Sequence, residues 1–112
     1  MGHLLFMGDT IFEDKVKLLE AERKAIIEPW QKIGSPTTIQ SIHDRVEKEI
    51  GWNPSWNTIK KDIEFFQENG WVEKLNMPGG QSIVKPNVDK MKGWQKIDFE
   101  EILRKSKQDD KK

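Results

Sequence analysis

The sequence contains no cysteine and only two histidines in 112 residues. The missing cysteines exclude a disulfide framework and any thiolate site, whether a zinc centre or a nucleophile. Two histidines cannot complete a metal centre without several carboxylate ligands. We therefore expect no metal and no cofactor. A chain without cysteine also suits the reducing cytoplasm.

Long apolar runs are missing as well. No stretch approaches the roughly 20 apolar residues that a membrane span needs. The first seven residues read MGHLLFM, and they lack the basic flank and the longer apolar segment of a signal peptide. The sequence thus predicts neither a membrane span nor export.

The sequence has no net charge, since 19 basic residues balance 19 acidic ones. This balance argues against a protein held to nucleic acid by bulk charge alone, so the distribution of charge matters more than its sum. Residues 71–97 hold five lysines against two acidic residues, whereas residues 1–70 have an acidic excess. Positive charge is therefore concentrated after Gly70.

Apolar residues are few, at 35% of the chain against 34% charged residues. The core of a single domain must then be built from a few large side chains, including five tryptophans. We expect Trp30, Trp52 and Trp71 in the core, because each stands at the boundary of a predicted element. The positions of Trp56 and Trp94 stay open.

The first half of the chain has the apolar spacing of amphipathic helices. Residues 10–33 place apolar side chains three and four apart, after a terminus over residues 1–9 that we expect to be flexible. Pro29 lacks an amide proton and clashes with the preceding turn, so a kink or a break is expected just before it. A second helix follows the N-cap candidates Thr37 and Thr38.

A third helix is predicted over residues 54–69. Gly51 ends the helix before it, and the short connection offers Asn53 and Ser55 as N-caps. Gly70 supplies the left-handed exit that commonly ends a helix.

After Gly70 the apolar period changes from helical to alternating. Residues 71–75 and 81–85 read as two strands around the turn Met77-Pro-Gly-Gly. A linker and a C-terminal helix are expected over residues 87–107, with Asp98 as the cap of that helix. Residues 108–112 read as a disordered charged tail.

The element order and residues 55–72, which read SWNTIKKDIEFFQENGWV, resemble the winged helix-turn-helix family of prokaryotic and archaeal transcription regulators. The resemblance implies an α+β, mostly α fold, with a three-helix core and a two-stranded β-hairpin wing over residues 10–86. The long first helix is expected to form an N-terminal extension of this core, and a short helix is expected at the C-terminal end. The resemblance also implies that helix 54–69 enters the major groove of double-stranded DNA and that the 71–86 wing contacts the backbone.

A helical wheel of residues 54–69 separates two faces. Ile59, Ile63 and Phe66 share a narrow apolar stripe. The opposite side carries Asn57, Lys60 and Lys61, whose side chains can donate to base edges and phosphates, and Ser55 can add a phosphate contact at the helix start. Glu64 and Glu68 would repel phosphates, so contact is expected in the first two turns only. The other interpretation of this face is an ordinary solvated helix surface.

The predicted wing offers a second set of polar contacts. Its strands carry Lys74 and Lys85, and Gln81 follows the turn. Small polar and basic residues suit contacts with a phosphate backbone. A plain hairpin turn would explain Pro78-Gly-Gly equally well.

No catalytic arrangement is evident. His43 stands beside Asp44 on an exposed helix position, and no serine or carboxylate pair is spaced to join it in an acid–base or nucleophilic set. Gly79-Gly80 lacks the lysine that follows the glycines of a phosphate-binding loop. We expect a protein that is not an enzyme and has no small-molecule ligand.

The sequence leaves several functions open. The first is a DNA-binding transcription regulator, cytoplasmic and nucleoid-associated, which would pair as a homodimer through residues 10–33 and 98–107 because two half-sites lengthen the DNA site. A replication or plasmid-maintenance factor would also bind DNA. A protein–protein interaction module is the alternative from another class, because the winged-helix fold alone does not fix function.

Overall fold

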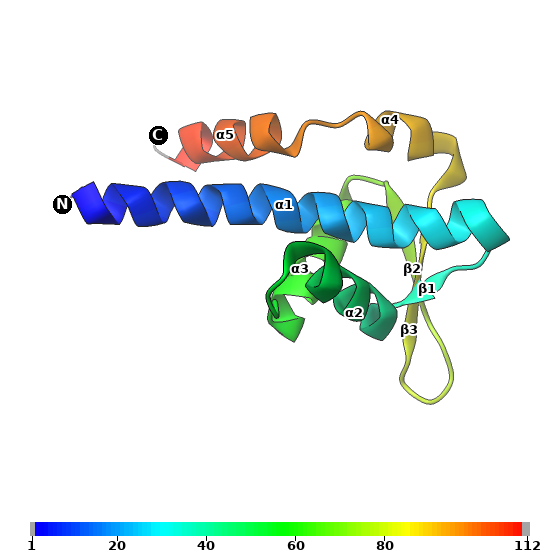
Figure 1. Ribbon diagram of the computed structural model, residues 1–112. Coiled ribbons are helices and arrows are strands. Elements are labelled where there is room, and N and C mark those ends of the chain that lie inside the picture. The colour runs from blue at the N-terminus through cyan, green and yellow to red at the C-terminus, as the bar shows by residue number, and fades with distance from the viewer. Residues whose placement is uncertain (1, 111–112) are drawn as a thin grey trace.

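The computed structural model describes the backbone of residues 2–110 and the side chains of residues 12–105. The chain is α+β, mostly helical, with one small antiparallel sheet (Figure 1). The elements follow in the order α1 (Gly2–Ile33), β1 (Thr37–Thr38), α2 (Ile39–Ile50), α3 (Trp56–Glu68), β2 (Val72–Asn76), β3 (Ser82–Pro86), η1 (Val88–Lys90), α4 (Met91–Gln95) and α5 (Phe99–Asp110).

The long helix α1 runs through the middle of the molecule. In Figure 1, α4 and α5 lie along one side of it, and α2, α3 and the sheet lie on the other. Within residues 2–110, no helix is both long enough and apolar enough to cross a membrane.

Helix α1 is longer and more continuous than the sequence predicts. The expected break near Pro29 is wrong, because the helix continues through it to Ile33. Pro29 is itself buried, as are the preceding Ile26 and Ile27. Tertiary packing therefore outweighs the lost amide hydrogen bond. The backbone of residues 2–9, predicted as a flexible terminus, also lies in α1, and this stretch contains no proline to prevent a helix.

Helices α2 and α3 begin and end at the predicted kinds of residue. The Thr38 side chain caps α2 by accepting from the amide of Ser41 at 3.1 Å, and Gly51 ends α2 with a φ of 84°. Ser55 caps α3 by accepting from the amide of Thr58 at 3.1 Å. These caps satisfy backbone donors that a helix start leaves unpaired.

The sheet has three strands, one more than the predicted two-stranded hairpin contains. The predicted hairpin is present as β2 and β3, and β1 adds a third, outer strand in the order β1-β3-β2. Thr37 pairs with Val84, and Thr38 pairs with Ile83. A two-residue strand is too short to show an alternating pattern in the sequence.

The segment after the sheet is more helical than expected. The predicted linker contains η1 and α4, and α5 extends to Asp110, into the stretch predicted as a disordered tail. Residues 111–112 of that tail lie outside the described residues. The Asp98 carboxylate accepts from the amide of Glu100 at 3.0 Å, as the predicted cap of α5. Arg23 of α1 donates to the carbonyl oxygens of Trp94 and Ile97 at 2.8 and 2.9 Å, which fixes this segment to α1.

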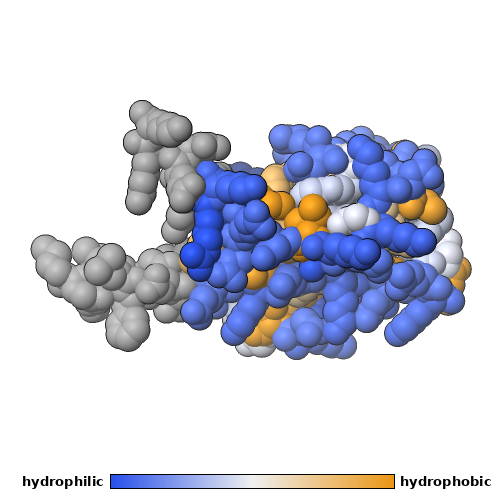
Figure 2. All heavy atoms as spheres, turned by 90° about the horizontal axis from the view of Figure 1, so that it is seen from above, coloured by the Kyte–Doolittle hydropathy of each residue, from blue (hydrophilic) through white to orange (hydrophobic). Residues whose placement is uncertain are grey.

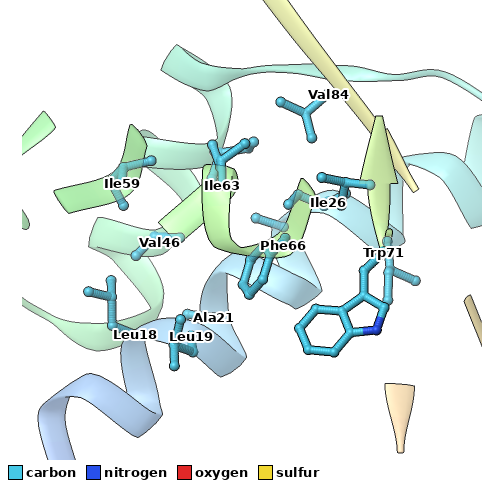
Figure 3. Close-up of a cluster of buried hydrophobic side chains, with 14 of the residues drawn as sticks. Leu18, Leu19, Ala21, Ile26, Val46, Ile59, Ile63, Phe66, Trp71 and Val84 are labelled. Atoms are coloured by element: carbon cyan, nitrogen blue, oxygen red, sulfur yellow. The ribbon is translucent and has the colours of Figure 1, made fainter. Parts of the chain in front are cut away.

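The core gathers side chains from α1, α2, α3 and β3 (Figure 3). Trp94, which the sequence left open, is fully buried and packs on Phe66 with ring centroids 5.1 Å apart. Trp71 is buried as predicted, and Trp30 is half-buried. The prediction for Trp52 is wrong, because its side chain is 40% exposed in the connection between α2 and α3. That connection is short and lies at the surface.

One carboxyl group is buried where α1 faces α3. Glu22 is fully buried, and neither of its carboxyl oxygens accepts a hydrogen bond. Asp62 of α3 is buried next to it and accepts from Lys15 Nζ at 2.5 Å. Burial and then the negative charge of Asp62 raise the pKa of Glu22 well above its usual range. Protonated Glu22 can donate to the Asp62 carboxylate.

Glu22→Gln should raise the free energy of unfolding at about pH 7 by about 1 to 3 kcal/mol, because an amide can donate to Asp62 without first taking up a proton, as the Glu22 carboxylate must on folding. In the wild type, the folded state holds the Glu22 proton more tightly than the unfolded chain. The contribution of this group is therefore present at low pH and lost as pH rises through the raised pKa. Chemical denaturation at several pH values measures the difference, which should shrink towards about pH 4.

Glu20→Gln is the matched control, because Glu20 is exposed on the same helix. A Glu22→Gln gain that did not depend on pH, or no gain at neutral pH, would contradict a protonated Glu22 in the fold.

Candidate nucleic-acid interface

The connection between α2 and α3 is held by His43. This α2 residue places its ring Nε2 2.9 Å from the Asn53 side-chain oxygen and 3.0 Å from the Pro54 carbonyl oxygen. Both neighbours are acceptors, so Nε2 carries the proton. Pro54 is buried and Ser55 follows it as the cap of α3. The start of α3 is thereby fixed against α2.

Helix α3 has the two faces that the helical wheel predicts. Ile59, Ile63 and Phe66 are fully buried against α1, α2 and the sheet. The predicted contact residues Asn57, Lys60 and Lys61 are exposed. Exposed as well are Glu64 and Glu68, in the later turns of the helix.

A groove of about 350 Å³ separates α3 from the tip of the β2–β3 hairpin. It brings together two of the predicted site residues, Lys60 from α3 and Gln81 from the hairpin. The remaining lining residues are Thr38, Ile39, Gln40, Trp56, Gly80 and Ser82. The start of α2 therefore forms the third wall of this groove.

The two predicted lysines of the hairpin lie on opposite faces of the sheet. Lys74 pairs with the buried Val84, whereas Lys85 pairs with Glu73 in the next register position. Lys85 Nζ lies 3.5 Å from the Glu73 carboxylate and 5.4 Å from the centre of the Trp30 ring. Lys85 is thus held by an ion pair and by α1, and it does not line the groove with Lys60.

Ser55 has a structural role at the predicted site. Its side-chain oxygen accepts from the Thr58 amide and lies 2.8 Å from the Thr58 hydroxyl oxygen. A phosphate contact would have to share this oxygen with the helix cap.

Sequence reasoning missed Gln40 and left Trp56 open. Both line the groove, and Trp56 is 41% exposed at the first turn of α3. On a helical wheel Trp56 falls at the edge of the stripe that Ile59, Ile63 and Phe66 form, and such an edge position is a weak sequence signal for partial exposure. Gln40 carried no signal, because its position depends on how α2 packs beside the hairpin.

The opposite side of the molecule has a different surface. Viewed from the side of α4 and α5, it is largely hydrophilic, with apolar residues in separate small patches (Figure 2). The apolar residues of α1 and α5 predicted for a homodimer pack largely inside the chain. Leu18, Leu19, Ile26, Ile27 and Phe99 are buried, and Ile102 and Leu103 are partly buried against the same core.

Among residues 12–105, one group of potential metal ligands lies close together. Ligand atoms of His43, Asp44 and Glu47 are within 4.8 Å of one another on α2. The connection to α3 already holds the imidazole ring, and Asp44 is exposed. We assign no metal ion to these residues.

Neither a protein-family model nor a curated protein matches this sequence. Any functional conclusion therefore depends on the geometry of the chain itself.

Ser55→Ala should lower the free energy of unfolding by about 1 kcal/mol, because it removes the acceptor that caps α3. Ser55→Asp retains an acceptor at the same position and should keep most of the stability. Urea denaturation of the three proteins measures the effect. Equal stability of Ser55→Ala and the wild type would show that the cap contributes nothing.

Proposed function

We propose that this chain binds double-stranded DNA as a winged helix-turn-helix domain over residues 10–86 and acts as a transcription regulator. In this proposal α3 is the recognition helix, and the β2–β3 hairpin is the wing that contacts the DNA backbone. The contact residues would be Ser55, Asn57, Lys60, Lys61, Lys74 and Gln81.

One observation carries the proposal: Lys60 of α3 and Gln81 of the hairpin line the same groove. A duplex that places its major groove on α3 brings a phosphate strand beside the helix, where a lysine and an amide can donate to it. The short connection between α2 and α3, held by His43, supports the same interpretation, because it leaves the start of α3 exposed.

The charges of α3 limit how the helix can approach DNA. Lys60 and Lys61 lie in its first two turns, and Glu64 and Glu68 follow on the same exposed face. Phosphates would be attracted by the first pair and repelled by the second. The helix would therefore point its N-terminal end into the major groove rather than lie along it.

Lys85 has a smaller role in this proposal than the sequence suggests. Its ion pair with Glu73 and its place over Trp30 leave less of its charge available for phosphate. A homodimer through residues 10–33 and 98–107 stays a prediction. Most apolar residues of these segments already pack inside the chain, so few are left to form a dimer interface.

A protein-docking module is the second candidate, favoured by exposed apolar side chains on α3 and in the turn of the hairpin. Trp56 begins α3, and Met77 in the hairpin turn is 45% exposed. Large exposed apolar side chains at one place are a common mark of protein interfaces. Salt dependence separates the two candidates, because phosphate contacts weaken with salt much more than apolar contacts.

Lys60→Ala combined with Lys61→Ala should weaken binding to duplex DNA and leave the fold intact, because both side chains are exposed. The slope of log affinity against log salt concentration should fall by up to about 2, since each lost phosphate contact removes about one unit. Fluorescence anisotropy with random-sequence duplex across a salt series measures both quantities.

Lys17→Ala combined with Lys32→Ala is the matched control. Both lysines are exposed on α1, and the double variant changes net charge by the same amount. Equal losses in the two double variants would mean that bulk charge, rather than α3, binds DNA. Absence of binding by the wild type at low salt would favour the protein-docking module.

A further inference from the structure

The ring nitrogens of His43 face only oxygen acceptors. Its side chain is mostly buried, at 14% exposed, and its Nε2 faces the oxygens of Asn53 and Pro54. On the other side of the ring, Nδ1 lies 3.4 Å from a carboxylate oxygen of Asp44. Three acceptors therefore surround the two ring nitrogens.

A neutral imidazole cannot satisfy this arrangement. It has one N–H group and one nitrogen lone pair, so whichever tautomer forms, a lone pair faces an oxygen. The imidazolium donates from both nitrogens, and its bond to the Asp44 carboxylate is charge-assisted. The geometry thus favours the protonated ring.

The charged groups around the ring act in the same direction. Asp44 and Glu47 of α2 are its acidic neighbours, the connection contributes the neutral groups of Asn53 and Pro54, and α3 contributes the Trp56 ring. Burial lowers the pKa of His43. The hydrogen bonds to Pro54, Asp44 and Asn53 and the charge of Glu47 outweigh that effect, and the pKa is raised from its ordinary value.

We propose that His43 is a proton-operated latch of the α2–α3 connection, whose protonated form holds α3 in position to bind DNA. The inference rests on the proposed function and adds pH as a regulator of the same site. Residues 53–55 lead directly into the cap of α3, where the amides of Thr58 and Ile59 bond to Ser55. When His43 loses its proton, its hold on the connection weakens, and with it the bonds from the Thr58 and Ile59 amides to Ser55.

The sign of the pH effect follows from the raised pKa. The stabilising contribution of His43 is complete below the pKa of the unfolded chain and is lost as pH rises through the folded-state pKa. DNA affinity falls over the same interval. DNA binding by this protein is thus expected to be stronger at low pH, unlike that of a protein inactivated by acid.

The DNA experiment measures duplex affinity by anisotropy from about pH 6 to about pH 8.5, at constant ionic strength and with a chelator present. Wild-type affinity should fall by about three- to tenfold over this range, because the protonated ring, which holds the connection to α3, is lost as pH rises. His43→Gln should give a flat profile, since the amide can still donate to Asn53 and Pro54 but cannot titrate. His3→Gln, which removes the other histidine, should follow the wild type.

A second measurement needs no DNA. NMR titration of the ring signals should give His43 a pKa above about 6.5, the ordinary value, and Asp44→Asn should lower it. Hydrogen exchange at Thr58 and Ile59, corrected for the intrinsic effect of pH, should accelerate above that pKa in the wild type and not in His43→Gln.

The two measurements separate the possible failures. A His43→Gln variant that keeps the wild-type pH profile, or a His43 pKa at or below the ordinary value, overturns the latch. If the wild type binds no DNA at any pH, the proposed function fails and the DNA part of the latch fails with it. Exchange at Thr58 and Ile59 then still decides whether the proton holds the connection.

Discussion

The fold depends on the apolar face of α1, which is covered on two sides at once. Leu18, Leu19, Ile26 and Ile27 are buried, with α2, α3 and the sheet on one side of α1 and α4 and α5 on the other (Figure 1). Burying one such side chain stabilises a fold by about 1.5 to 3 kcal/mol. Without this helix, Ile42 and Val46 of α2 would lose much of their cover, because α2 packs directly on α1. The helix that the sequence presents as an extension is thus the centre of the domain.

The parts of the fold that depend on local chemistry could be predicted from the sequence. Each of these features depends on a few neighbouring residues. They are the spacing of Ile39, Ile42 and Val46, the N-caps Thr38 and Ser55, and the glycines that follow α2 and α3. Elements that are short or held by distant partners could not be predicted. The two residues of β1 exist as a strand only because β3 lies beside them. Trp94 is buried by Phe66 and Trp71, which are far from it in the sequence.

In the candidate site too, some features could be predicted from local sequence and others could not. The exposure of Asn57, Lys60 and Lys61 follows from the period of one helix, so the helical wheel found it. The surroundings of Lys85 depend on strand register and on Trp30 of α1, and no local pattern contains that information. The groove between α3 and the hairpin likewise belongs to the tertiary structure, which explains why Gln40 went unnoticed.

The strand β1 does more than enlarge the sheet. Thr38 pairs with Ile83 of β3 and at the same time caps α2, so one residue connects the hairpin to the helix layer. These contacts restrict the orientation of the hairpin relative to α2 in the isolated chain. An interface built in this way has little conformational entropy left to lose on association. A partner of the proposed interface would therefore meet a preformed surface rather than one that folds around it.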